Sequence, residues 1–446
     1  MLYEGEHVRR ALSPAGLVDW RALAATDFFT RASEDGSVVA TRELDAPEAL
    51  PEGAAGMLGH ERIPFVSYPY EWPFGMLRDG AALQLEVLLG ALAEGLTLKD
   101  ASPYNVQWRG SAPVFVDVGS FERLREGEPW AGYRQFCMLF LYPLMLQAYK
   151  GVDFQPWLRG SLDGIAPRQL ARLMSRRDAL RPGVLAHVRL HARLDAGHGG
   201  AERDVRGELR DAGFASELIA ANARRLLKLV RRLEWAPERS VWTEYGTSNS
   251  YSHEDADHKA DFVRAAVATG DWDLTWDLGA NDGRFSRIAA ERSRYVVAID
   301  ADHGAAEHLY RGLRADGERA ILALTLDLSD PSPGLGWRGL ERHTLAGRGR
   351  PDLVLCLALV HHMAIAANVP PAQWLAWLRG LGAQLVIEFA LREDPMVQRL
   401  LAAKSHAHAD YDVDRFEELL SELFVVERSQ ALGSGTRRLY FARPRE

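Results

Sequence analysis

From about residue 236 to the end of the chain, short apolar runs alternate with amphipathic segments. Continuously apolar runs of this length are typical of strands buried on both faces, and the segments between them have helical spacing. The alternation predicts an α/β fold with a parallel, Rossmann-like sheet flanked by helices. The expected strands are residues 274–279, 295–300, 321–328, 352–359 and 385–389.

The apolar pattern of the rest of the chain predicts a C-terminal hairpin and two further regions before residue 236. Runs at 424–429 and 438–442, joined by the turn Gly433-Ser434-Gly435, predict a final antiparallel hairpin. Residues 126–235 carry apolar positions three and four apart and predict a helical region, whereas residues 1–125 mix β-like runs with a helix, a loop and a hairpin. We therefore expect an α+β region at 1–125, a helical region at 126–235 and the parallel sheet at 236–446.

Composition narrows the class of protein. A chain of 446 residues with 47% hydrophobic and 26% charged residues is long enough for two or three globular domains. The net charge of −8 argues against a nucleic-acid-coating protein. Two cysteines exclude a disulfide framework, the first residues lack a signal-peptide pattern, and the longest apolar run, 136–146, is broken by Pro143. We expect a soluble, cytoplasmic protein with no membrane span.

Polar residues gather at the predicted carboxyl ends of the strands. In an open α/β sheet, ligands bind beyond these ends, at the point where the strand order reverses. Glycines there let the backbone approach a ligand, and an acid at the end of the second strand suits the two hydroxyls of a ribose. The residues concerned are Asp277, Gly279, Gly283, Asp300, Asp327, His361 and Glu388.

A nucleotide of the NAD type fits this pattern poorly. The spacing Gly279-x-Asn281-x-Gly283 places Arg284 where the third glycine of a dinucleotide fingerprint would fall. The pattern instead resembles class I S-adenosylmethionine-dependent methyltransferases, with 277–283 as their first motif and Asn281 in place of the usual middle glycine. The resemblance implies a seven-stranded sheet and S-adenosyl-L-methionine as cofactor, held by Asp277, Gly279, Asn281, Gly283, Asp300, Asp327 and Leu328.

Three further stretches, at 327–337, 357–362 and 393–397, resemble a bacterial group of methyltransferases akin to nodulation host-specificity proteins. As far as that resemblance implies, the acceptors of this group are poorly defined. Our own hypothesis is methyl transfer to a small-molecule or glycan-like acceptor, and we expect the acceptor atom to be oxygen. An alcohol acceptor needs a base, and we predict His361 or His362 in that role. The alternatives are a pair that caps the strand, or a metal site among His361, His362, Glu388, His406, His408 and Asp410.

The segment before the first strand permits two interpretations of equal weight. It either covers the cofactor or is a packed linker. Its candidate residues are Trp242, Tyr245, Asn249, Ser250, Tyr251, Lys259 and Phe262.

The N-terminal region carries a second pattern. Asp100, Asn105 and Asp117, the last in an Asp-x-Gly after an apolar run, resemble the catalytic and metal-binding loops of the protein-kinase-like fold. The region lacks a glycine-rich phosphate loop, so we expect a degenerate kinase-like domain that serves as scaffold or substrate platform. The alternatives for this region are a phosphotransferase that uses Mg-ATP and a simple turn at Asp100 and Asn105. For the protein as a whole, a further alternative is a non-catalytic binding module whose cofactor pocket is vestigial. The aromatic segment 64–74 fits either an acceptor surface or a core strand and turn.

Overall fold

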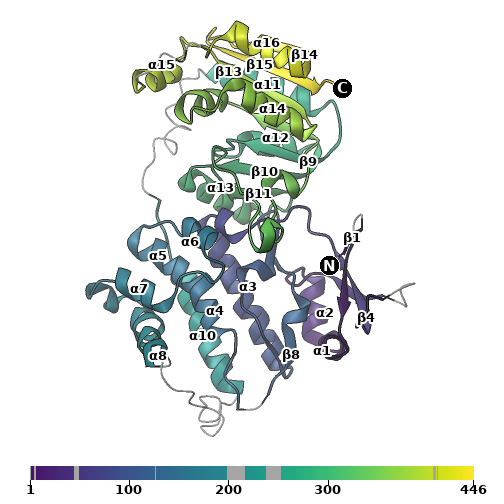
Figure 1. Ribbon diagram of the computed structural model, residues 1–446, viewed down its shortest axis with the longest axis vertical. Helices are drawn as coiled ribbons and strands as arrows, with labels where there is room; N and C mark the ends of the chain where they lie inside the picture. The colour runs from purple at the N-terminus through teal and green to yellow at the C-terminus, as the bar shows by residue number, and fades with distance from the viewer. Residues whose placement is uncertain are drawn as a thin grey trace. The chain divides into compact units, whose positions relative to one another are not determined.

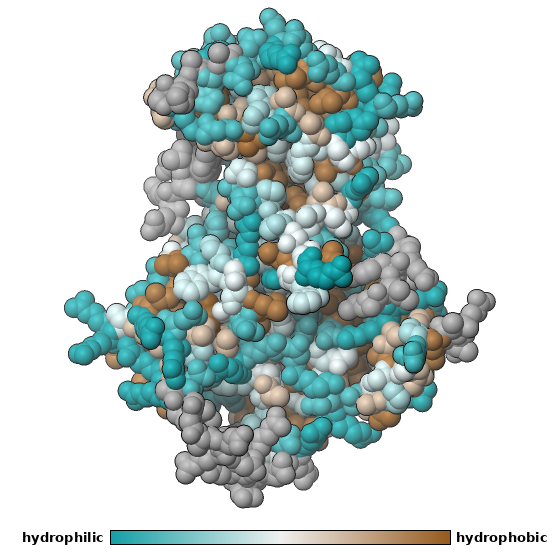
Figure 2. Space-filling model, in the orientation of Figure 1, coloured by the Kyte–Doolittle hydropathy of each residue, from teal (hydrophilic) through white to brown (hydrophobic). Residues whose placement is uncertain are grey.

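The computed structural model describes residues 2–4, 7–44, 50–125, 127–197, 216–237, 253–404, 408 and 410–446. The chain forms two compact units (Figure 1; space-filling view in Figure 2). The first comprises Met1–Trp108 and Pro113–Ala236, and the second comprises Arg109–Ala112 and Pro237–Glu446. Among the described helices, none combines the length and the apolar character that a membrane crossing requires.

The first unit opens with a small antiparallel sheet and two helices. Its four strands lie in the order β1-β2-β4-β3. The helices were not expected from the apolar pattern, but local signals explain α1: the Ser13 side chain accepts a hydrogen bond from the Gly16 N–H, and a proline opens the helix. The bounds are β1 Leu2–Glu4, β2 His7–Leu12, α1 Pro14–Ala24, α2 Asp27–Glu34, β3 Thr41–Glu43 and β4 Gly56–Glu61.

A long buried helix, α3, forms the centre of this unit. It is apolar on most of its surface, and α10 packs along it. After α3 come two small antiparallel pairs, β5 with β8 and β6 with β7. The bounds are α3 Phe74–Ala93, β5 Leu96–Leu98, β6 Val106–Arg109, β7 Ala112–Phe115, β8 Phe121–Arg123 and α10 Ser216–Arg232.

Helices complete the first unit, as the spacing predicted. Helices α4 and α5 are joined by a π-helical turn, Cys137–Leu141, into one nearly continuous buried helix. The aromatic segment 64–74 is core rather than surface, because Phe65, Trp72 and Phe74 are fully buried. The bounds are α4 Tyr133–Phe136, α5 Tyr142–Lys150, α6 Gln155–Gly160, α7 Pro167–Leu173, a π-helical segment Val184–Leu190 and α8 His191–Gly197.

The second unit is built on a seven-stranded sheet in the order β11-β10-β9-β12-β13-β15-β14. The first five strands in this order are parallel, and β15 and β14 run antiparallel at the end. This confirms the seven-stranded sheet with a terminal hairpin. The bounds are β9 Trp272–Leu278, β10 Ser293–Asp300, β11 Ile321–Thr325, β12 Leu353–Cys356, β13 Gln384–Ala390, β14 Phe424–Ala431 and β15 Arg437–Pro444.

The order of the strands reverses around β9. The chain adds β10 and β11 on one side of β9, and then β12 and β13 on the other. Such a switch point opens a crevice at the carboxyl ends of the two central strands. The helices that accompany the sheet are α11 His253–Val267, α12 Arg284–Ala290, α13 His303–Asp316, α14 Pro371–Leu381, α15 Pro395–Ala402 and α16 Val413–Leu423.

Two strands end earlier than the apolar pattern predicted. Strand β11 stops at Thr325 and β12 at Cys356, so Asp327 and His361 lie in loops beyond the sheet. The apolar run after β12 continues, but Ala358 has a φ of 54°, a left-handed conformation that ends the strand. Left-handed alanine is uncommon, and backbone strain of this kind concentrates at functional sites.

Candidate functional site

The loop after β9 is shaped by three left-handed residues. Gly279, Asn281 and Gly283 have φ values of 78°, 48° and 77°. At Gly283 a Cβ atom would lie 2.4 Å from the Leu309 side chain, so the position needs glycine for space as well as for conformation. Asparagine adopts the left-handed region more readily than most residues, which explains how Asn281 replaces a glycine here.

Asp300, at the end of β10, ties this loop to the sheet. One carboxylate oxygen accepts a hydrogen bond from the Asn281 N–H at 2.8 Å, and the other accepts from the Asp302 N–H at 2.8 Å. Each oxygen has two lone pairs, so each keeps one for a further donor. Burial raises the pKa of Asp300, and the backbone N–H groups of Asp302, Asn281 and Ala301 oppose that rise. The structure thus brings Asn281 and Asp300 together as the sequence predicted.

Asp277 is the next-to-last residue of β9, just before the loop, and its side chain is almost fully buried. Its side chain accepts a hydrogen bond from the Ser286 hydroxyl at 2.6 Å. Burial raises the pKa of Asp277 to about 6, even though the Ser286 hydrogen bond and the charge of Lys259 favour the ionised form. A buried carboxylate of this kind lacks a sufficient counter-ion and is a candidate for binding a cationic ligand group.

Asp327 and Leu328 follow β11 directly. Asp327 is exposed, and its carboxylate accepts hydrogen bonds from the Ser329 N–H at 2.8 Å and the Ser329 hydroxyl at 2.7 Å. Leu326 bonds through its N–H to the Asp300 carbonyl, which places this turn next to the end of β10. The acid is held by its own turn, and Leu328 beside it is half-buried.

His361 and His362 follow the left-handed Ala358 beyond β12. Their ring centroids lie 4.1 Å apart, and His362 begins a π-helical turn, His362–Ala366, a feature often found at functional sites. His361 is fully buried, yet neither of its ring nitrogens has a hydrogen-bond partner among the described residues. Buried polar atoms normally have partners, so this side chain lacks one that a ligand or water would supply.

Both imidazoles are neutral at physiological pH. Burial lowers the pKa of His362 to about 4, with the charge of Arg437 contributing. Burial is also the main reason that the pKa of His361 lies well below its usual value. His362, Arg437 and Lys259 lower it further. A neutral imidazole has one nitrogen free to accept a proton, which is what a base requires.

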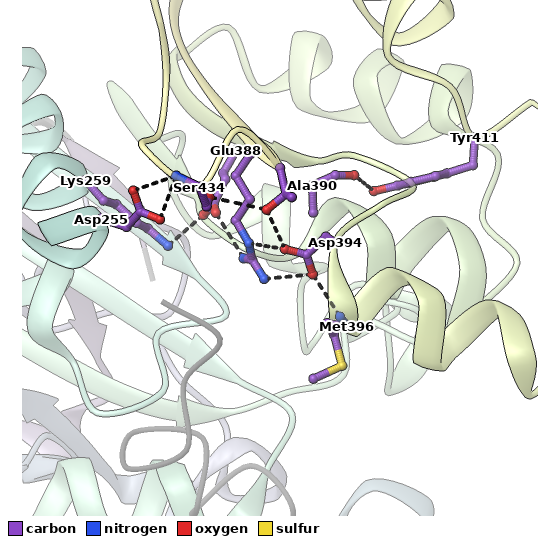
Figure 3. Close-up of polar contacts among 10 residues, drawn as sticks. Asp255, Lys259, Glu388, Ala390, Asp394, Met396, Tyr411 and Ser434 are labelled. Atoms are coloured by element: carbon purple, nitrogen blue, oxygen red, sulfur yellow. Dashed lines mark hydrogen bonds and ion pairs between the residues drawn. The ribbon is translucent and has the colours of Figure 1, made fainter. Parts of the chain in front are cut away.

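A buried network of charges lies at the carboxyl end of β13 (Figure 3). Lys259 of α11 contacts Glu388 of β13 at 2.6 Å, and Arg437 of β15 contacts the same carboxylate at 3.1 Å. Arg437 also donates to Asp394 at 2.7 Å. Two cations thus meet two carboxylates away from water, and the network joins α11, β13, β15 and the start of α15.

Sequence reasoning missed this network apart from naming Lys259 and Glu388 separately. Lys259, proposed as a cofactor cover or linker residue, is buried and paired with Glu388. Phe262 packs under the Arg428 guanidinium, whose carbon lies 4.3 Å from the ring centroid. The other residues of that segment, Trp242, Tyr245, Asn249, Ser250 and Tyr251, lie outside the described residues.

The metal alternative finds no support in the part of the chain that the structure describes. There, no group of three or more His, Cys, Asp or Glu side chains is placed to hold a metal ion. Glu388, a suggested ligand, is bound to Lys259 and Arg437 instead. His406 is not among the described residues.

The three kinase-like positions of the first unit are only partly brought together. Asn105 donates to the Ser120 hydroxyl at 3.3 Å, and Ser120 donates to Asp117 at 2.5 Å. Asp117 also forms an ion pair with Arg10, so its charge is already balanced within the chain. One carboxylate oxygen of Asp100 is buried without a partner among the described residues. The kinase-like resemblance is not confirmed.

Comparisons with known proteins show to which family the chain belongs. No family model matches it. It is 32% identical over 389 residues to the nodulation protein NoeA of Rhizobium meliloti (strain 1021), a match that covers 86% of this chain and 81% of the relative.

Among solved structures, the N-methyltransferase NodS of Bradyrhizobium japonicum WM9 is 13% identical and covers 44% of this chain and 99% of its own, with a TM-score of 0.33. A SAM-dependent methyltransferase of Aquifex aeolicus is 15% identical, covers 46% of this chain and 100% of its own, and has a TM-score of 0.33. Because the match to the rhizobial protein spans most of both chains, this protein belongs to the family of the nodulation protein NoeA.

Proposed function

We propose that this protein transfers the methyl group of S-adenosyl-L-methionine to an oxygen atom of a small-molecule or glycan-like acceptor. The site lies at the carboxyl ends of β9, β10 and β12, and the observation that carries the proposal is the pairing of Asp300 with the left-handed loop 277–283. Such a switch-point crevice is where this class of sheet binds its ligands.

In this proposal Asp300 binds the ribose of the cofactor. Its carboxylate is already oriented by the Asn281 and Asp302 N–H groups, and each oxygen keeps a lone pair for one ribose hydroxyl. Hydrogen bonds to a charged acceptor contribute about 1.5–3 kcal/mol each, so two of them provide much of the affinity for the nucleoside. Asp327 and Leu328, at the neighbouring strand end, are assigned to the adenine.

Asp277 complements the positive charge of the cofactor. The amino acid portion carries an ammonium group and the sulfonium a second positive charge, whereas burial raises the pKa of Asp277 to about 6 because the chain supplies too little compensation. A cationic ligand in the crevice would favour the ionised carboxylate. Gly279 and Gly283 keep the loop backbone in the conformation that leaves space for this portion.

The cofactor supplies an activated methyl group, so the chain has to align the acceptor, exclude water and remove one proton. We assign the proton to His361 or His362. As the acceptor oxygen gains the methyl group, its proton moves to a neutral ring nitrogen. The missing partner of the buried His361 ring supports this assignment, because an acceptor hydroxyl satisfies it.

Calorimetric titration with S-adenosylhomocysteine, the demethylated cofactor, tests the assignment. We expect Asp300→Ala to weaken binding roughly 10²–10⁴-fold, from the loss of two charge-assisted hydrogen bonds. Asp316→Ala is the matched control, since its exposed carboxylate on α13 pairs with Arg287 outside the loop. Equal affinity of the Asp300→Ala variant and the wild type would refute the ribose assignment.

The acceptor itself is sought by incubating the protein with labelled S-adenosylmethionine and candidate small molecules or glycans, followed by mass spectrometry of the methylated product. A product carrying the new methyl group on nitrogen or carbon would contradict the oxygen assignment while leaving the cofactor site in place. A role of the N-terminal region as substrate platform is tested in the same assay, because a fragment lacking that region would bind S-adenosylhomocysteine but methylate the acceptor poorly.

A further inference from the structure

The segment from Pro167 to Leu194 is strongly basic. It contains seven arginines and a single acidic residue, Asp178, in a chain whose net charge is −8. Asp178 is buried and contacts Lys150 at 3.0 Å and Arg181 at 3.3 Å, so its charge is balanced by neighbouring cations. The surface of this segment therefore carries an excess of positive charge.

The arginines concerned are on the outside of the first unit. Arg172 lies in the last turn of α7, and Arg176 and Arg177 follow the helix; all three are exposed and have no acidic partner among the described residues. Arg189 donates to the Ser175 carbonyl at 2.8 Å, which fixes the segment Val184–Leu190 against the connection after α7. Helices α7 and α8 lie side by side at the edge of this unit (Figure 1).

Exposed leucines lie among these arginines. Leu180 is 91% exposed at the end of a short turn, with Arg177 before it and Arg181 after it. Leu173, Leu185 and Leu190 are 41%, 63% and 51% exposed. Single exposed leucines are ordinary, but four in one short basic segment are not.

We propose that this basic–leucine surface, formed by Arg172, Leu173, Arg176, Arg177, Leu180, Leu185 and Leu190, docks on an anionic lipid bilayer. Guanidinium groups form bidentate hydrogen bonds with phosphate, and leucines beside them enter the boundary between headgroups and acyl chains. The combination identifies the partner: a nucleic acid would use the arginines and leave the leucines in water. A projecting Leu180 also fits a fluid layer better than the flat face of a protein partner.

The proposal does not depend on the methyltransferase assignment. It places the protein at a membrane surface, where it would meet acceptors held at or near that surface. Because the attraction is partly electrostatic, binding falls as salt screens the charges, while the contribution of the leucines persists.

Co-sedimentation of the full chain with vesicles tests the proposal. We expect binding to vesicles of phosphatidylcholine mixed with phosphatidylglycerol, and much weaker binding to phosphatidylcholine alone. Each basic residue near an anionic leaflet strengthens binding about fivefold, and an inserted leucine about tenfold. The variant R177Q/L180S should therefore bind the mixed vesicles about 50-fold more weakly.

The matched control is R338Q/L340S in the second unit. It removes the same charge and a leucine that is 60% exposed, and it should bind the vesicles like the wild type. All four side chains are exposed, so both variants should retain the wild-type circular dichroism spectrum and melting temperature.

Three outcomes would overturn the proposal: no binding of the wild type to mixed vesicles at low salt, equal binding to both vesicle types, or equal loss in test and control variants. Competition by double-stranded DNA that depends on Arg177 but not on Leu180 would identify a nucleic acid as the partner instead.

Discussion

Both units place an aspartate at or just past the carboxyl end of an apolar strand, with further polar residues close by, but they treat its charge differently. In the first unit, Asp117 forms an ion pair with Arg10 and accepts a hydrogen bond from Ser120. In the second, Asp277 is buried with a raised pKa, and both nitrogens of His361, in the loop after β12, lack a partner among the described residues. Similar residue types thus form one balanced cluster and one that needs a ligand.

The difference between Asp117 and Asp277 shows how a ligand site can be told from a polar cluster that the chain itself satisfies. A sequence motif gives only the residue types, and the residue types around Asp117 and around Asp277 are both suitable for a ligand site. Only the structure shows whether the chain itself satisfies them, and a native structure leaves few buried polar groups unsatisfied without a functional reason.

The largest expected effect comes from removing both imidazoles. His361→Ala with His362→Ala should lower kcat by roughly 10²–10⁴, the usual contribution of a general base, and leave the affinity for S-adenosylhomocysteine nearly unchanged. Steady-state kinetics and calorimetry measure the two quantities. Equal losses in turnover and affinity would mean that the pair is structural, and the site would then resemble the balanced cluster of the first unit.

The pH dependence of turnover by the wild type also tests whether one of the two histidines is the base. A base works only when unprotonated, and the pKa of His362 is lowered to about 4. With the cofactor saturating, so that the ionisation of Asp277 in the free enzyme is not seen, we expect kcat to stay level as the pH falls from 7 to about 5 and to decline only when the pH approaches 4. An acid limb near the ordinary histidine pKa of 6.5 would contradict a buried histidine as the base.

Stability should depend strongly on Glu388. Glu388→Ala leaves Lys259 and Arg437 buried without their shared carboxylate, and breaking a buried pair in this way costs about 3–5 kcal/mol. Urea denaturation measures the loss. The exposed pair of Arg415 and Glu418 is the control, since Glu418→Ala should cost about 0–1 kcal/mol. Similar small losses in both variants would mean that the network tolerates an unpaired charge.

Asp277→Asn should stabilise the protein and weaken cofactor binding. The folded pKa of Asp277 is about 6 against a reference value of 3.8, so ionisation costs stability as the pH rises through this interval. At pH 7 the variant should gain roughly 1–3 kcal/mol in free energy of unfolding, and the gain should vanish below about pH 4. Loss of stability at pH 7 would show that the carboxylate is well compensated.

The smallest effect is expected in the first unit. Asp117→Asn removes an ion pair that is partly exposed, and we expect a stability loss of about 1 kcal/mol with no change in methyl transfer. Denaturation and the methylation assay measure both. Magnesium-dependent binding of ATP by the wild type, abolished in this variant, would instead support the phosphotransferase alternative and remove the contrast between the two clusters.

Much of the second unit could be predicted from the sequence, because strands buried on both faces read as continuous apolar runs. The positions of Asp300 and Asn281 followed from that sheet. The end of β12 did not, since the apolar run 357–360 continues beyond Cys356 and only the φ of Ala358 ends the strand. Helices α1 and α2 were missed because they are short and interrupt β-like runs.

The buried charge network could not be predicted either. Lys259, Glu388 and Arg437 come from a helix, a parallel strand and the terminal hairpin, and no local pattern joins them. A charged residue within an apolar strand, such as Glu388 in β13, was the one available signal. It suggested a metal ligand, because the partner cations lie far away in the sequence.

A crystal structure of the protein with S-adenosylhomocysteine tests the central claim most directly. We expect the ribose hydroxyls on the Asp300 carboxylate, the amino acid portion against the loop 277–283 near Asp277, and the sulfur atom facing His361 or His362. Ligand bound elsewhere on the sheet, or a crevice at the ends of β9 and β10 closed by side chains, would contradict it.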